Sequence, residues 1–233
     1  TLKVKPGEVW SVLGRNGVGK TTLLHTLAGL RDPLGGQIKL DGVALNSLAT
    51  KTRGQKVSIL FQQSQAPIST DAYDFVMSAR HPWISRWAGP TRDDQDIVVE
   101  SLSQMGLDAL MHRDVNSLSG GERRRVELAA TVAQNAQTIL LDEPVNHLDL
   151  HYQINLLQGA LTKWRAEGRA VVMVMHDLNL AIRFSDHLLC LCGDGSILQG
   201  ETSAVATTEN LSTLLRYPLQ ALTLGDRSFF IPA

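Results

Sequence analysis

The sequence predicts an α/β fold with a mostly parallel β-sheet, because short apolar runs alternate with helical patterns along most of the chain. Two of these runs, residues 138–141 and 170–175, are almost uninterrupted, which is typical of strands buried on both faces. From Gln62 to about Asn135 the pattern changes to successive helical segments. We therefore expect a parallel sheet covered by helices, with a helical lobe inserted into it.

Each predicted element follows from a local pattern. Strands are expected at the apolar runs, and helices where apolar side chains recur every three or four residues. The predicted strands cover residues 9–13, 37–40, 57–61, 138–141, 170–175 and 188–192. The predicted helices cover residues 20–30, 71–80, 93–105, 120–135 and 178–184, and one more begins at residue 151. Because parallel strands end at the same edge of a sheet, we expect the functional residues along that edge.

The first motif is a glycine-rich loop directly after the first predicted strand. Residues 14–21 read Gly-Arg-Asn-Gly-Val-Gly-Lys-Thr, which fits G-x-x-x-x-G-K-[ST]. Such a loop turns backbone N–H groups toward an anion, and the following helix adds its positive end. Lys20 can reach the outer phosphates, and Thr21 can bind Mg²⁺. The candidate binding residues are Gly14, Asn16, Gly17, Val18, Gly19, Lys20, Thr21 and Thr22. The loop predicts binding of a nucleoside triphosphate.

Two acidic residues follow the apolar run 138–141. Asp142 ends the run, and Glu143 comes next. Ionised carboxylates beside a buried strand are costly unless a cation or hydrogen-bond donors compensate them. Asp142 is therefore predicted to hold Mg²⁺ through water, and Glu143 to orient and deprotonate an attacking water. The alternative is a solvent-exposed Asp-Glu-Pro turn.

Further motifs complete a family pattern. Residues 118–122 read Leu-Ser-Gly-Gly-Glu, Gln62 follows the run 57–61, Asp149 ends Asn-His-Leu-Asp, and His176 follows the run 170–175. With the glycine-rich loop and residues 138–144, in this order, they resemble the ATPase subunit of ATP-binding cassette (ABC) transporters along nearly the whole chain. The resemblance implies a P-loop NTPase fold with a mostly parallel sheet core, an antiparallel β portion and an inserted α-helical subdomain. It implies one ABC ATPase domain over residues 1–233, with a RecA-like catalytic lobe (1–62 and 136–233) and a helical lobe (63–135) containing the signature motif.

The resemblance also implies roles for these residues. Glu143 acts as general base, His176 donates to the γ-phosphate, and Gln62 binds Mg²⁺ and positions water, although the adjacent Gln63 leaves that assignment open. With Lys20, these form the catalytic set. The implied cofactors are ATP and Mg²⁺, with Thr21, Gln62 and Asp142 as metal ligands. Two copies are implied to face head to tail as a homodimer. Nucleotide held by one copy would then meet Ser119, Gly120, Gly121 and Asp149 of the other.

The kind of transporter that this ATPase would power is predicted from a shorter resemblance. Residues 78–83, Ser-Ala-Arg-His-Pro-Trp, are similar to a stretch in importers of ferric siderophores, haem and cobalamin. We therefore expect an importer subunit, peripheral on the cytoplasmic face of the cell membrane. Its partners would be membrane permease subunits and, indirectly, a periplasmic or extracellular substrate-binding protein. The alternatives are a translation or DNA-maintenance ATPase, and a regulatory subunit that binds ATP without hydrolysing it.

Composition agrees with this interpretation. The 233 residues are 43% hydrophobic, enough for one sizeable core or two small lobes. A formal net charge of −1 gives no global attraction to nucleic acid, so none is expected as a partner. No apolar run approaches the ~20 residues of a membrane-spanning helix. The chain starts at Thr1 without an initiator Met, so we expect an upstream segment and assign no adenine-stacking residue.

Several weaker patterns are interpreted as structural. Cys190 and Cys192 lie in an apolar run and are expected to be buried free thiols. His147 and His151 lack the Glu of H-E-x-x-H, so a zinc site is not expected. The run Arg123–Arg125 could hold ATP or an acidic neighbouring surface, but a solvated charge run is favoured. Arg15, Val145 and Ala130 depart from the commonest family residues without removing a catalytic group.

Overall fold

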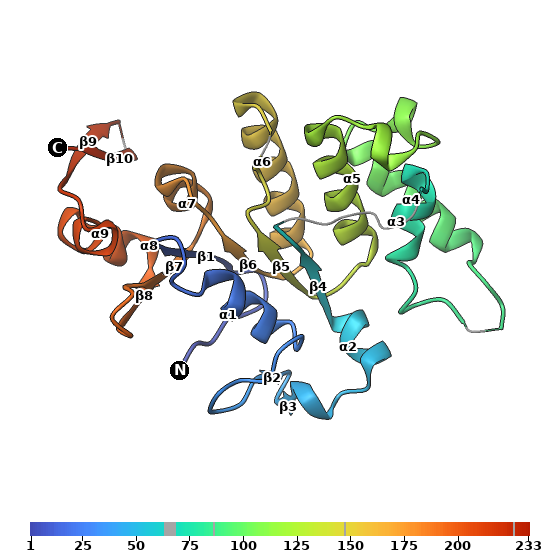
Figure 1. Cartoon of the computed structure of the whole chain (residues 1–233), viewed down its shortest axis with the longest axis horizontal. Helices are drawn as coiled ribbons and strands as arrows, with labels where there is room; N and C mark the ends of the chain where they lie inside the picture. Colours follow the sequence, from blue (N-terminus) through green and yellow to red (C-terminus); the bar gives the residue numbers. More distant parts are fainter. Residues whose placement is uncertain (63–68, 86, 147, 226) are drawn as a thin grey trace.

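The computed structural model describes residues 1–62, 69–85, 87–146, 148–225 and 227–233 (Figure 1). Its main feature is a six-stranded sheet in the order β4-β5-β6-β1-β7-β8. The strands are β1 (Val9–Gly14), β4 (Val57–Leu60), β5 (Thr138–Asp142), β6 (Ala170–Val174), β7 (His187–Leu191) and β8 (Ile197–Glu201). The first five are mutually parallel, and β8 pairs antiparallel with β7 at the edge. The predicted mostly parallel sheet is confirmed.

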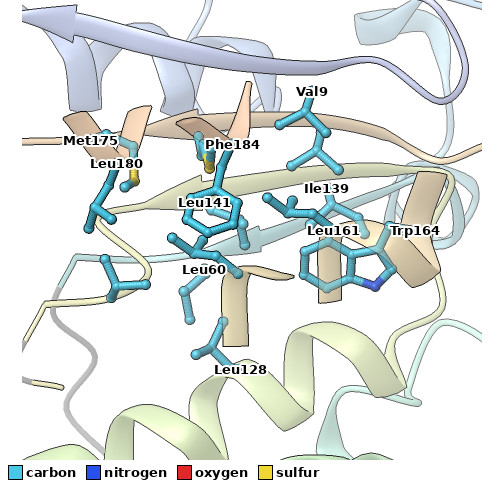
Figure 2. Close-up of a cluster of buried hydrophobic side chains, with 14 of the residues drawn as sticks. Val9, Leu60, Leu128, Ile139, Leu141, Leu161, Trp164, Met175, Leu180 and Phe184 are labelled. Carbon is cyan, nitrogen blue, oxygen red and sulfur yellow. The ribbon is translucent and has the colours of Figure 1, made fainter. Parts of the chain in front are cut away.

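Helices cover both faces of this sheet (Figure 1). Helix α1 (Lys20–Leu27) lies on one face, and α6 (Leu150–Ala166) and α7 (Leu178–Phe184) lie on the other. Because neighbouring strand residues point to opposite faces, β5 contributes to two separate cores. Leu140 belongs to the core cluster that contains Leu24 of α1, whereas Leu141 belongs to the cluster that contains Phe184 of α7 and Trp164 of α6 (Figure 2). Each such fully buried side chain stabilises the fold by roughly 1.5–3 kcal/mol.

The described residues between β4 and β5 contain a group of three α-helices. They are α3 (Ala72–Ser78), α4 (Arg92–Gln104) and α5 (Gly120–Ala133), and they pack against one another. The short 3₁₀ helices η2 (Asp108–Leu110) and η3 (Val115–Ser117) connect α4 to α5. Each long helix begins at a side-chain cap, with capping boxes at Thr91 for α4 and at Ser119 for α5. A buried ion pair between Arg80 and Asp94, with 2.8 Å between Nη2 and Oδ1, ties α4 to the end of α3.

Smaller elements complete the chain. They are β2 (Lys39–Leu40), β3 (Val43–Ala44), η1 (Leu45–Ser47), α2 (Thr50–Lys56), α8 (Thr202–Val205), α9 (Thr208–Leu215), β9 (Leu219–Leu224) and β10 (Arg227–Pro232). The pairs β2–β3 and β9–β10 are antiparallel, which, with β8, gives the expected antiparallel portion. The strand predicted over residues 37–40 shortens to two residues. The helix predicted over 120–135 ends at Ala133, because Asn135 adopts a left-handed φ of 56°.

Three expectations about single residues and spans can be compared with the structure. Cys190 is buried, and burial raises the pKa of its thiol to about 12, so it stays a protonated core side chain, whereas Cys192 is only half-buried. His147 lies outside the described residues. Within the described residues, no helix combines the length and apolar content that crossing a bilayer requires.

Candidate active site

The functional candidates gather where the parallel strands end. Gly14 ends β1, Gln62 follows β4, Glu143 follows β5, and His176 follows β6. Since these four strands run parallel, their carboxyl ends meet along one edge of the sheet. A cavity of about 330 Å³ lies there. Its lining consists of Asn16, Gly17, Gly19, Lys20, Thr21, Thr22, Gln62, Glu143 and His176.

The glycine-rich loop is shaped to leave N–H groups free. Gly14 has a φ of 155°, and a Cβ there would come within 2.8 Å of the Leu191 carbonyl oxygen and 2.9 Å of Val18 Cγ1. No larger residue fits that approach. Gly19 caps α1 in a left-handed conformation with no side-chain hydrogen bond. The first N–H groups of α1 are therefore available to an anion in the cavity.

Lys20 supplies the positive charge beside these N–H groups. Its side chain is buried, and Nζ donates to the carbonyl oxygens of Gly14 at 2.8 Å and Arg15 at 3.1 Å. Burial lowers the pKa of Lys20, while Glu143 and Asp142 oppose that shift. The ammonium group is thus held across the loop, with a donor still available for a phosphate oxygen.

Asp142 is the clearest unsatisfied group in the site. It is fully buried, and neither carboxylate oxygen has a hydrogen-bond partner among the described residues. Burial raises the pKa of Asp142; the neighbouring Thr21 hydroxyl offsets part of that rise, and Glu143 adds to it. A buried carboxylate with no donor nearby except the Thr21 hydroxyl is costly, and carboxylate and hydroxyl oxygens are ligands that Mg²⁺ prefers. The orphaned oxygens beside Thr21 therefore fit a divalent cation.

Glu143 is held by three neighbours. Gln62 Nε2 donates to its Oε1 at 3.0 Å, His176 Nε2 bonds to the same oxygen, and Asn146 Nδ2 donates to Oε2. An ionised carboxylate only accepts hydrogen bonds, so Nε2 of His176 carries the proton. Glu143 itself adopts a left-handed φ of 51°, which costs about 1–2 kcal/mol for a residue with a Cβ. A strained, buried carboxylate surrounded by donors faces the cavity that Lys20 lines.

Asn146 and Arg124 contact this site but are not among the predicted site residues. Asn146 reaches Glu143 because the chain turns immediately after β5, and its N–H donates to the Glu143 carbonyl at 3.3 Å. The prediction that residues Arg123–Arg125 form a solvated charge run is wrong at Arg124. Its side chain is only 4% exposed and donates to carbonyl oxygens at two strand ends. A usable signal was its helical spacing with Leu128 and Val132, both buried.

The signature residues do not join the same cavity. Ser119 caps α5, and its Oγ donates to Glu122 Oε2 at 2.7 Å while accepting from the Glu122 N–H at 3.3 Å. Ser119 and Gly120 are exposed, and Gly121 is half-buried. Asp149 is exposed and caps α6 by accepting from the Tyr152 N–H at 3.0 Å. Within one chain, none of these residues lines the cavity beside Lys20.

Comparisons with known proteins agree with this geometry. A model of the ABC transporter family matches residues 1–146. The petrobactin import ATP-binding protein FpuD of Bacillus anthracis is 36% identical, over 95% of this chain and 81% of its own length. The hemin import ATP-binding protein HmuV of Pseudomonas fluorescens is 38% identical, over 97% of this chain and 89% of its own.

A solved structure shares the fold. The dimeric structure of MJ0796, described as a bacterial ABC transporter cassette, has a TM-score of 0.78 and 29% identity, covering 86% of this chain and 88% of that one. The chain therefore has relatives both in sequence and in three-dimensional fold. The chain belongs to the ABC transporter family, as a cassette that binds and hydrolyses ATP.

Proposed function

We propose that this cassette powers an importer of iron chelates, with a siderophore or haem as cargo and cobalamin as a less supported choice. The observation that carries the ATPase part is the Glu143 carboxylate, fixed by Gln62, Asn146 and His176 at a cavity whose opposite lining is the phosphate loop. The cargo class rests on the relatives, whose names describe petrobactin and hemin import. The similarity of residues 78–83 to such importers supports the same choice.

ATP binding is assigned to the phosphate loop. The N–H groups at the start of α1 and the Lys20 ammonium hold the phosphates, and the loop backbone from Gly14 to Thr22 encloses them. Thr21, Gln62 and Asp142 would hold Mg²⁺, directly or through water. When bound, Mg²⁺ supplies positive charge to the phosphate oxygens. The orphaned carboxylate of Asp142 is the support for this assignment.

Hydrolysis is assigned to Glu143 and its donors. A water oxygen attacks the γ-phosphorus, the bond to the bridging oxygen breaks, and ADP leaves with that oxygen. Glu143 accepts the proton of the attacking water, so its carboxylate must be ionised and correctly oriented. Gln62 positions the water. When nucleotide is bound, His176 turns its Nε2–H from Glu143 to the charge that develops on the γ-phosphate.

Completion of each site is assigned to a second copy. In our proposal, two chains associate head to tail, and Ser119, Gly120 and Gly121 of one chain meet nucleotide bound by the other, with Asp149 at the junction. Two facts support this: these residues are solvent-facing or half-buried and absent from their own cavity, and the related MJ0796 cassette is dimeric. The catalytic lobe would be residues 1–62 and 136–233, and the helical lobe residues 63–135.

The membrane permease is the proposed target of the helical segment. We propose a peripheral position on the cytoplasmic face of the membrane, with the permease contacting the surface beside Gln62 and residues 81–90. Trp87 is 93% exposed there and Trp83 39% exposed, which gives this surface apolar contact area. The extracellular binding protein acts only through the permease. A translation or DNA-maintenance role would instead predict stimulation of hydrolysis by nucleic acid.

Self-association of the Glu143→Gln protein tests this proposal first. Removing the base should lower hydrolysis by roughly 10²- to 10⁴-fold and leave ATP bound. Light scattering should then find a dimer with Mg²⁺-ATP and a monomer with ADP. Asn146→Ala is the matched control, since it removes a Glu143 partner and leaves the carboxylate.

Two outcomes would contradict the proposal. Hydrolysis of ATP by the Glu143→Gln protein at the wild-type rate would show that Glu143 is not the general base. A persistent monomer with confirmed ATP binding would contradict the assignment of Ser119 and Gly121 to the partner's nucleotide.

A further inference from the structure

Arg124 is a buried arginine with every N–H group engaged. It lies in the second turn of α5, the helix that begins just after Ser119. Nε donates to Pro144 O at 3.3 Å, Nη1 to Phe61 O at 2.6 Å and Glu127 Oε2 at 2.8 Å, and Nη2 to Asp142 O at 2.7 Å and Glu143 O at 2.8 Å. A guanidinium has five N–H donors in a fixed plane, and here all five have acceptors.

The four main-chain acceptors come from two strand ends. Phe61 precedes Gln62 after β4, and the other three carbonyls belong to residues 142–144 after β5. Arg124 therefore spans the gap between the backbone that carries Gln62 and the backbone that carries Glu143. It also bonds the carbonyls on both sides of the left-handed Glu143. Such bonds can hold a conformation that the chain would otherwise leave.

The same side chain connects this backbone to the signature end of α5. Ser119, Gly120 and Gly121 lie within about a turn and a half before Arg124. A helix moves as a rigid element over this distance, so displacement of its N-terminus moves the guanidinium too. The guanidinium is fixed to its own helix by Glu127, one turn further on.

We propose that Arg124 is a positioning residue for hydrolysis: it sets the main chain of Gln62 and Glu143 and makes their alignment depend on the place of α5. Contact of Ser119 with a partner's nucleotide would thereby be transmitted to the chain's own Glu143. This inference rests on the proposed role of Glu143. A purely structural arginine would stabilise the fold equally well without affecting the reaction.

Arg124→Lys is the direct test, with Arg169→Lys as its matched control. Lysine keeps the charge but has three donors in place of five and no planar fork. We expect kcat to fall roughly 10- to 100-fold, because small misplacements of catalytic groups cost about this much. The dissociation constant for ATP, from fluorescence titration, should change less than about twofold. Arg169 is also buried and donates to the Ala136 carbonyl, but it precedes β6 at the end opposite His176. Its variant should lose thermal stability and keep kcat.

A double-mutant cycle separates positioning from stability. In the Glu143→Gln background the base is absent, so Arg124→Lys should cause no more than about a twofold further loss of residual hydrolysis. If the two losses multiply, Arg124 does not act through Glu143 and the proposal is wrong. If Arg124→Lys alone keeps wild-type kcat while Glu143→Gln is inactive, the proposal fails and the role of Glu143 stands. If Glu143→Gln hydrolyses normally, both fail.

Glu127→Gln provides a second variant should Arg124→Lys not fold. It keeps Arg124 and weakens one of its orienting partners. The expected result is a kcat lowered about threefold with an unchanged dissociation constant for ATP. An unchanged kcat in a folded Glu127→Gln protein would overturn the proposal.

Discussion

The N-termini of α1 and α5 are both suited to bind phosphate, yet they are built in opposite ways. The start of α1 follows Gly19, has no side-chain cap, and faces a cavity with Lys20 beside it. The start of α5 is closed by its own capping box, in which Ser119 and Glu122 satisfy each other. The first end is prepared for a ligand within the single chain. In our proposal, the second exchanges its internal hydrogen bonds for those of a nucleotide bound by another copy, and until then its capping box keeps it satisfied.

The carboxylates near the N-termini of α1 and α5 differ in whether they are hydrogen-bonded within the chain. Asp142 beside α1 is buried without a partner, and burial raises its pKa. Glu122 on α5 is bonded by Ser119, and these hydrogen bonds lower its pKa. One carboxylate is costly until something binds it, whereas the other is already satisfied. The α1 end therefore gains stability from its ligand, and the α5 end does not need one to be stable.

Loss of the charge at α1 should have the largest effect. Lys20→Met is expected to weaken ATP binding by about 100-fold, since a charged hydrogen-bonding partner contributes roughly 1.5–3 kcal/mol. Lys163→Met serves as control, because Lys163 pairs with Glu100 and Glu167 away from the cavity. Fluorescence titration of the single chain measures both. An affinity for Lys20→Met within threefold of wild type would contradict the preformed site at α1.

Ser119→Ala should affect assembly and the stability of α5, but not the ATP-binding cavity of the single chain. We expect unchanged ATP affinity, hydrolysis at saturating ATP lowered about tenfold, and a cap loss of about 1 kcal/mol. The matched control is Thr91→Ala, which removes the other capping box, on α4. It should lose similar stability, seen as a fall in melting temperature, and keep hydrolysis. An equal loss of hydrolysis in both variants would mean that Ser119 only caps α5 and does not contact nucleotide.

In the nucleotide-free protein, Asp142→Asn should cause only a small change in stability, and this change should be a gain. The folded pKa of Asp142 lies above its ordinary value of 3.8, so its unfavourable contribution is absent below that value and grows as pH rises toward the folded pKa. We expect the nucleotide-free variant to melt at least about 2 °C above wild type at pH 7, roughly 1 kcal/mol for a chain of this size. The gain should vanish near pH 3.

Glu122→Gln is the comparison variant for Asp142→Asn. The pKa of Glu122 is lowered, so its contribution is stabilising above the ordinary value of 4.5 and is lost as pH falls. Its replacement should therefore give no gain at pH 7. Calorimetry across pH measures both variants. A lower melting temperature for Asp142→Asn at pH 7 would mean that its carboxylate is satisfied in the unliganded protein.

The elements of the sheet were predictable because their signals are local. The runs that became β1, β5 and β6 are apolar almost throughout, as strands buried on both faces must be. The segment 37–40, in which polar and apolar residues alternate, was also predicted as a strand but forms only the two-residue strand β2, half of which is exposed. A short apolar run does not reveal whether a sheet lies beside it.

The site was predictable where a motif fixes both residue type and position. Gln62, Glu143 and His176 follow their strands, and the structure brings them together. Arg124 was misjudged because its neighbours Arg123 and Arg125 suggest a charged surface, while its acceptors are main-chain carbonyls 18 to 63 residues away in sequence. Every residue has a main-chain carbonyl. A pattern of residue types therefore does not indicate which carbonyls will accept hydrogen bonds from Arg124.

The central place of β1 in the sheet has a consequence for synthesis. This strand carries the phosphate loop and is made before both of its neighbours, β6 and β7, with Val9 opposite Val171 and Trp10 opposite His187. A nascent chain that has reached residue 146 contains the whole loop motif and neither of the strands that flank it. Both edges of β1 stay unpaired until the segment that begins near Val171 has left the ribosome. The nucleotide site is therefore completed late, although its most recognisable sequence comes first.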